Sequence, residues 1–110
     1  MTVSAARKAP TIEVLYFEGC PNYEALVLRL PELLGHAGVK AEMKLRQVES
    51  EEDARRERFL GSPTVRVDGR DVEPNASGRT DYGLKCRLYR TPGGIVAVPP
   101  DALVVDAFEA

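Results

Sequence analysis

The stretch from Thr11 to Tyr23, TIEVLYFEGCPNY, constrains the fold of this chain more than any other. Six residues that prefer strands, 12–17, lead into Glu-Gly-Cys-Pro, and apolar residues at helical spacing follow. Proline suits the first position of a helix, because its missing N–H would have no partner there. The sequence therefore predicts a central strand that passes directly into a helix, with Cys20 at or beside the helix N-cap.

Cys20 has two interpretations at this position. The free backbone N–H groups and the positive end of the helix dipole stabilise a thiolate, the nucleophilic form of cysteine. Free cysteine is also among the residue types most often buried, and there it is inert. The sequence leaves both open: a reactive, solvent-accessible thiolate or a core residue.

The next segments predict a helix, a strand and a second helix. The first helix extends to about His36, with a kink at Pro31, which lacks an N–H. Residues 39–46 alternate between apolar and charged, as in a strand with one exposed face. Ser50 is a favourable N-cap, and the three acidic residues after it suit the start of a short helix that ends before Gly61.

Residues 62–72 predict a β-hairpin. Asp68-Gly69, between two short β-rich runs, is a strong signal for a two-residue turn. Pro63 stands at the first position of the incoming strand, one of the few places where a strand tolerates proline.

The C-terminal third has a weaker pattern. An excursion over about 73–99 contains Cys86, in a stretch that favours neither helix nor strand. Asp101 is the expected N-cap of a last helix, whose apolar residues at 103, 104, 107 and 108 have helical spacing. We therefore expect one domain over 11–110, preceded by a flexible lead-in over 1–10.

Composition excludes several classes of function. A chain of 110 residues can form a core without disulfides, and its net charge of -2 gives no reason to expect nucleic acid or a membrane surface as partner. Two cysteines are too few for a secreted disulfide scaffold. No segment resembles a signal peptide, and no apolar run approaches the roughly 18 residues that span a bilayer. We expect a cytoplasmic protein, in which thiols stay reduced unless they cycle.

The order strand, helix, strand, helix, hairpin, helix resembles the thioredoxin superfamily. Two motifs carry the resemblance: GCPNY at 19–23, at the place of the active-site motif, and GSPT at 61–64, which looks like the cis-proline loop that faces it. The resemblance covers roughly 11–72. It implies an α/β fold, βαβ-α-ββ-α, in which a central mixed sheet has helices on both faces. The chain also looks like a group of small bacterial thioredoxin-like proteins sometimes labelled alkylmercury-lyase-related. This label is a hint of soft-metal binding and does not imply carbon–mercury cleavage.

The resemblance assigns roles to individual residues. Cys20 corresponds to the nucleophilic cysteine, and Pro63 to the cis residue whose preceding backbone pairs with an extended substrate. The implied substrate-binding residues are Ser62, Pro63, Thr64 and Tyr23. Dithiol members have a second cysteine where this chain has Tyr23, so Cys20 has no local disulfide partner. Monothiol members work through glutathione or bind metal.

Cys86 has three interpretations. As a resolving thiol it forms a disulfide with Cys20, which requires that the two Cα atoms approach within about 7 Å. As a ligand it completes a two-thiolate site with Cys20 for a soft ion such as Hg(II), Cu(I) or Zn(II). The third interpretation is a small buried residue beside Leu84 and Leu88.

Three functions therefore remain open. The first, an enzymatic one, is thiol–disulfide or glutathione exchange with a disulfide-bearing protein or a low-molecular-weight thiol, in which Cys20 is the nucleophile and no cofactor is required. The second is binding of a soft metal ion or an organomercurial by Cys20 and Cys86 without turnover. The third is a non-catalytic interaction module that uses the edge strand of the hairpin.

Overall fold

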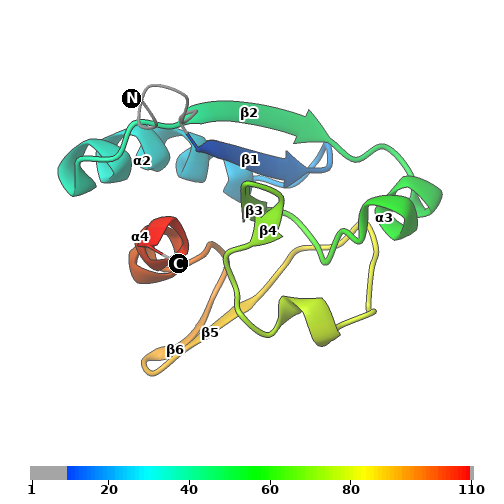
Figure 1. Cartoon of the computed structure of the whole chain (residues 1–110). Helices are drawn as coiled ribbons and strands as arrows, with labels where there is room; N and C mark the ends of the chain where they lie inside the picture. The colour runs from blue at the N-terminus through cyan, green and yellow to red at the C-terminus, as the bar shows by residue number, and fades with distance from the viewer. Residues whose placement is uncertain (1–9, 110) are drawn as a thin grey trace.

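The computed structural model describes residues 10–109, except the side chain of Glu109, and shows a mixed α/β fold with three α-helices (Figure 1). Nearly all of the lead-in expected over 1–10 lies outside the described residues. The elements follow one another as β1 (Thr11–Tyr16), α2 (Asn22–Ala37), β2 (Glu42–Gln47), α3 (Glu51–Glu57), β3 (Thr64–Val67), β4 (Arg70–Asp71), the 3-10 turn η1 (Ala76–Gly78), β5 (Tyr89–Thr91), β6 (Gly94–Val96) and α4 (Asp101–Glu109).

The main sheet is mixed and has the strand order β2-β1-β3-β4. Strand β2 runs parallel to β1, with Val14 opposite Leu45, and β3 runs antiparallel to β1, with Val14 opposite Val65. The central position expected for β1 is confirmed, because β1 pairs with β2 along one edge and with β3 along the other.

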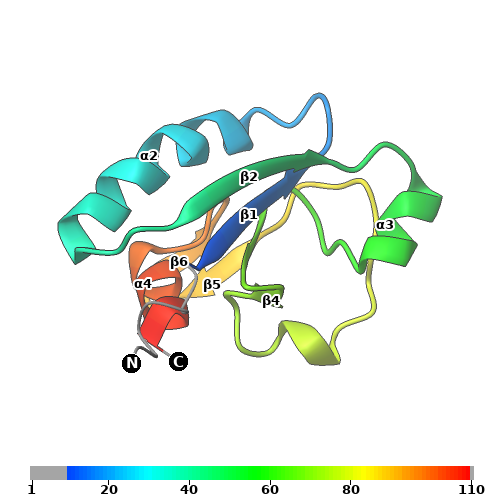
Figure 2. The ribbon, with the colours of Figure 1, turned by 45° about the horizontal axis from the view of Figure 1, so that its top comes forward.

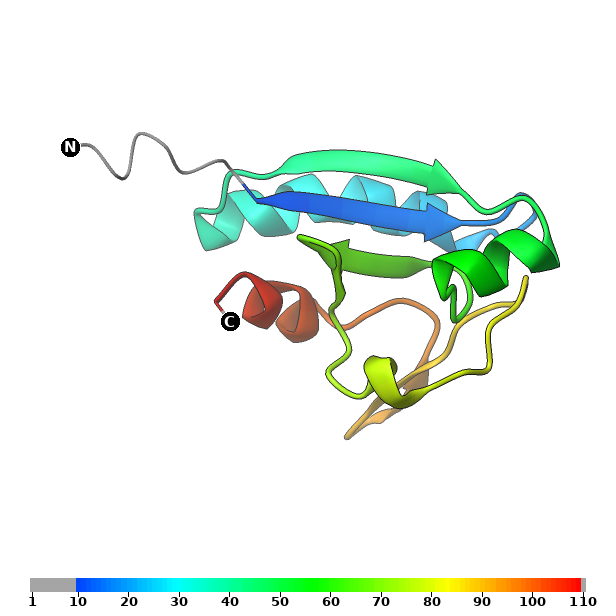
Figure 3. The ribbon, with the colours of Figure 1, turned by 45° about the vertical axis from the view of Figure 1, so that its right-hand side comes forward.

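The core lies mainly on one face of the sheet, which α2 and α4 cover (Figures 2 and 3). Ile12 and Val14 pack there against the buried leucines of α2 and against Val104 of α4. Leu15 points to the opposite face, where it packs with Ala54 of α3 and with two other buried residues, Val48 and Phe59. Helix α3 therefore contacts this second face at the end of β1.

One local expectation differs from the structure. All six residues of β2 are exposed, rather than those of one face, because β2 is an edge strand that the helices leave uncovered. Helix α2 continues through Pro31 and ends at Ala37, close to the expected end near His36, with a left-handed C-cap at Gly38. Helix α3 has the expected Ser50 cap and ends before Gly61, with a left-handed C-cap at Arg58.

The β3–β4 hairpin has the turn that the sequence predicts. Asp68 and Gly69 have φ angles of 50° and 85°, and positive values at both positions are what a type I′ turn requires. After it the excursion over 73–99 contains η1 and a second hairpin, β5–β6, which projects away from the main sheet (Figure 1). Among the described residues, no helix has the length and apolar character needed to cross a membrane.

Candidate functional site

Cys20 lies where β1 has ended and α2 is about to begin. Pro21 is the N-cap residue of α2, so Cys20 is next to the N-cap as expected. Its amide donates a hydrogen bond to the Phe17 carbonyl at 3.3 Å, and Gly19 takes a φ of 101° in the turn between them. Cys20 is only 2% exposed, however. Of the two interpretations left open for Cys20, the structure shows the buried residue and not the solvent-accessible thiol.

The loop over 61–64 faces this cysteine. The Ser62–Pro63 peptide bond is cis. The Cys20 thiol donates a hydrogen bond to the Ser62 carbonyl oxygen, with 3.6 Å between Sγ and O. The two motifs that stand 42 residues apart in the chain are thus in direct contact.

The segment around Cys86 runs alongside the same loop and forms a parallel β-bridge with Ser62. The Ser62 amide donates to the Lys85 carbonyl at 2.8 Å, and the Arg87 amide donates to the Ser62 carbonyl at 2.9 Å. One carbonyl, that of Ser62, therefore accepts both the Arg87 amide and the Cys20 thiol. This arrangement brings Cys86 beside Cys20.

Both cysteines are free, and Cys86 is the exposed one. Its interpretation as a buried residue is wrong, because Leu88 is 57% exposed and Cys86 itself faces solvent. Desolvation raises the pKa of the Cys86 thiol, and the neighbouring Cys20 sulfur raises it further through charge and hydrogen bonding. Cys86 therefore stays protonated to higher pH than a free cysteine does.

The residues expected to bind substrate are largely buried or engaged in contacts with other residues of the protein. Ser62 and Thr64 are fully buried, and Pro63 is buried too. The Thr64 hydroxyl donates to the Gly61 carbonyl at 2.6 Å and accepts from Arg87 at 3.1 Å. Tyr23 is half-buried and stacks on Tyr16, with ring centroids 4.1 Å apart. Thr64 thus supports the loop and has no hydrogen-bonding capacity directed at a ligand.

Arg87 connects the segment around Cys86 to the β3–β4 hairpin, and sequence reasoning did not assign it this role. It is 1% exposed, and its guanidinium donates to both carboxylate oxygens of Asp71, at 2.7 and 2.9 Å, and to Glu73 at 2.9 Å. Desolvation lowers the pKa of Arg87, but the hydrogen bonds and charge of Asp71 outweigh it, and the net shift is upward. Arg87 therefore remains charged in the interior.

Tyr89 is a second residue that sequence reasoning missed. Its hydroxyl donates to the Pro63 carbonyl at 2.7 Å, and its ring lies under the Arg87 guanidinium, 4.6 Å from centroid to carbon. The one available signal was the alternation of Arg87 and Tyr89 with Cys86 and Leu88, which has the period of a strand. Charged inward-facing residues conceal such a pattern, since apolar residues usually take that place.

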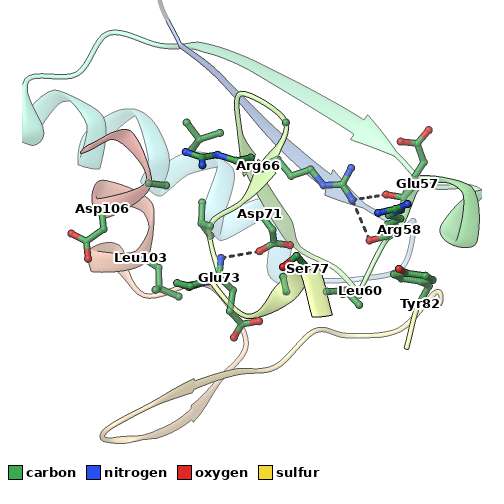
Figure 4. Close-up of a pocket in the computed structure, with 17 residues that line it drawn as sticks. Glu57, Arg58, Leu60, Arg66, Asp71, Glu73, Ser77, Tyr82, Leu103 and Asp106 are labelled. Atoms are coloured by element: carbon green, nitrogen blue, oxygen red, sulfur yellow. Dashed lines mark hydrogen bonds between the residues drawn. The ribbon is translucent and has the colours of Figure 1, made fainter. Parts of the chain in front are cut away.

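A groove of about 760 Å³ lies away from the cysteines, between the β3–β4 hairpin, η1 and α4 (Figure 4). Its lining within the described residues includes neither cysteine. Arg66 donates from one side of it to the carbonyls of Glu57 and Arg58, at 2.5 and 3.2 Å, and desolvation lowers the Arg66 pKa. Acidic and basic side chains both line the groove, so its charge selects no class of ligand.

Cys20 and Cys86 are the two thiols that a soft metal ion would use. Within residues 10–109, no group of three or more histidine, cysteine, aspartate or glutamate side chains is arranged to hold a metal. In comparisons with known proteins, no family model, no curated protein and no solved structure matches this chain.

Proposed function

We propose that this protein performs thiol–disulfide exchange by forming a reversible disulfide between Cys20 and Cys86. One observation carries the proposal: the Ser62 backbone holds the two cysteines beside each other although they stand at positions 20 and 86. The resemblance to the thioredoxin superfamily supports it, because a cysteine before a helix faces a cis-proline loop here as well. Cys86 would supply the second thiol that the position of Tyr23 lacks.

The exchange proceeds in two balanced steps. The thiolate of one cysteine attacks a sulfur of an external disulfide R–S–S–R, the S–S bond breaks, and the departing RS⁻ takes up a proton and leaves as RSH. The second cysteine then attacks the protein sulfur of the mixed disulfide and releases the second RSH. Two electrons pass from the protein dithiol to the external disulfide, and excess low-molecular-weight thiol reverses both steps.

The test is to oxidise the reduced protein with glutathione disulfide, block remaining thiols by alkylation, and map the peptides without reduction. We expect a peptide pair linked through Cys20 and Cys86, whose amount rises with the ratio of glutathione disulfide to the square of the glutathione concentration until all of the protein is oxidised. The Cys20→Ser and Cys86→Ser variants should lack it. Wild-type protein that yields only mixed disulfides, or only dimers between chains, would contradict the proposal.

A second candidate function is binding of a soft metal ion or organomercurial, and the same contact between two free thiols favours it. Two thiolates suit soft ions such as Hg(II) and Cu(I). We expect Hg(II) to bind stoichiometrically, as measured by thiolate–metal absorption. This binding should be lost when either cysteine is changed to serine. Unchanged affinity in the Cys86→Ser variant would contradict a two-thiolate site.

A further inference from the structure

The backbone of Ser62 is already paired within the protein. Its N–H bonds to Lys85 and its C=O bonds to Arg87, so both of its strand-forming groups are in use. An extended polypeptide that paired as a strand with the residue before Pro63 would need these same two groups. The residues 83–88, which we name the covering segment, occupy the place in which such a substrate would lie.

The covering segment is anchored and not loosely apposed. Arg87 is fixed by ion pairs to Asp71 and Glu73, whose side chains are themselves mostly buried. At Gly61, with a φ of 124°, an added Cβ would lie 3.0 Å from three atoms of Arg87. Contact this close leaves no room for a second strand between the loop and the segment.

The two cysteines also differ in their access to solvent. Cys20 is 2% exposed, whereas Cys86, on the segment itself, is exposed. An external disulfide can therefore reach the Cys86 sulfur in the folded protein. It reaches Cys20 only after the segment opens locally, which makes attack at Cys20 slower by the equilibrium constant of that opening.

Building on the proposed exchange function, we infer that Cys86 receives the external disulfide, that Cys20 resolves it, and that the substrate is a low-molecular-weight disulfide. Cys86 thiolate attacks one sulfur of R–S–S–R, and the first RSH departs. The Cys20 thiolate then attacks the Cys86 sulfur, the bond between Cys86 and R–S breaks, and the second RSH departs. The Cys20–Cys86 disulfide remains, and the external disulfide is reduced by two electrons.

The experiment uses the full-length protein and three thiol forms: wild type, Cys20→Ser and Cys86→Ser, with Cys20→Ala as a second variant of the buried site. Each is reduced and mixed at about pH 9, where a free thiol is substantially ionised, with bis(2-hydroxyethyl) disulfide. Samples are quenched with acid, and intact mass gives the rate of addition of one hydroxyethylthio group. Circular dichroism verifies that each variant is folded.

We expect Cys20→Ser and Cys20→Ala to form the mixed disulfide at least about tenfold faster than Cys86→Ser, since a buried thiol must wait for local opening. Wild type should pass rapidly to the internal disulfide. Equal rates in Cys86→Ser and Cys20→Ser, or a faster Cys86→Ser, would overturn the order of attack even if wild type still forms the internal disulfide. Failure of wild type to form that disulfide would instead overturn the exchange function itself.

The substrate class is tested separately with a linear peptide of about 10 residues whose single cysteine forms a mixed disulfide with 2-mercaptoethanol, a length sufficient for pairing as a strand. At equal concentration, we expect wild type to be oxidised more slowly by this peptide than by the hydroxyethyl disulfide. A peptide rate equal to or above that of the small disulfide would show that the covering segment yields to an extended substrate, and would overturn this part of the inference.

Discussion

At Ser62 one carbonyl oxygen accepts two donors, while the hydroxyl of the same residue has no hydrogen-bond partner within residues 10–109. The Ser62 backbone, which the resemblance expects to pair with an extended substrate, is instead paired within the protein. A buried polar group without a partner costs about 1–3 kcal/mol, whereas a satisfied one stabilises by about 1 kcal/mol. Ser62 and Thr64 differ in this respect although both are fully buried.

The first prediction concerns this difference. Ser62→Ala should leave the free energy of unfolding unchanged or raise it by up to about 1 kcal/mol, because an unsatisfied hydroxyl is removed. Thr64→Val, the matched control, should lower it by about 1–3 kcal/mol, because Arg87 and Gly61 lose a partner. Urea unfolding measures both. A larger loss in Ser62→Ala than in Thr64→Val would show that the Ser62 hydroxyl has a partner in solution.

The second prediction concerns the Cys86 thiol, whose pKa is raised by desolvation and then by Cys20. Alkylation requires the thiolate, so a raised pKa makes Cys86 react more slowly at neutral pH than a free cysteine. Cys20→Ser removes the second cause and leaves the first, so the midpoint of the rate–pH profile should move down. Iodoacetamide labelling followed by peptide mass gives the profile. An unchanged midpoint in Cys20→Ser would contradict contact between the two sulfurs.

At the scale of elements, the sequence predicted those turns and helix caps that are determined by neighbouring residues. Asp68-Gly69 gave the hairpin turn, and Ser50 the N-cap of α3, since each is decided by residues within about four positions. The covering segment is held by Asp71 and Glu73 and by a bridge to Ser62, all distant in the sequence. No local pattern specifies such partners, so the sequence offered the approach of Cys86 to Cys20 only as one interpretation beside that of a buried residue.

The third prediction tests the anchor of the covering segment. In the Cys86→Ser background, Glu73→Gln removes one of the charges paired with Arg87 but keeps an acceptor of similar shape. We expect alkylation of Cys20 to become several-fold faster, because the segment opens more often when its anchor is weaker. The free energy of unfolding should fall by about 1–3 kcal/mol.

The matched control for this change is Glu32→Gln in the same background. Glu32 pairs with Arg29 on the exposed surface of α2, where an ion pair contributes only about 0–1 kcal/mol. It should alter neither Cys20 labelling nor stability. If Glu73→Gln lowers stability but leaves Cys20 labelling unchanged, the covering segment does not control access to Cys20.

At the scale of the whole molecule, the contact between Cys20 and Cys86 connects the excursion over 73–99 to the end of the main sheet. The chain between the two cysteines includes α2, β2, α3 and the β3–β4 hairpin. A disulfide there would close a loop that holds more than half of the described chain. Cross-links across long loops remove the most conformational entropy from the unfolded state, so oxidation should be felt by the entire fold.

The fourth prediction follows from that loop. Closing about 65 residues should stabilise the oxidised protein by about 4 kcal/mol relative to the reduced protein. For a chain of this size the melting temperature should rise by at least about 10 °C, measured by circular dichroism in each redox state. By linkage, the native disulfide should have a reduction potential roughly 90 mV below that of the unfolded chain.

Cys86→Ser, the control, should melt at the same temperature with and without oxidant. An oxidised wild type that melts below the reduced form would show that the native placement of Cys86 beside Cys20 does not accommodate the bond, and the exchange function would then require the covering segment to move.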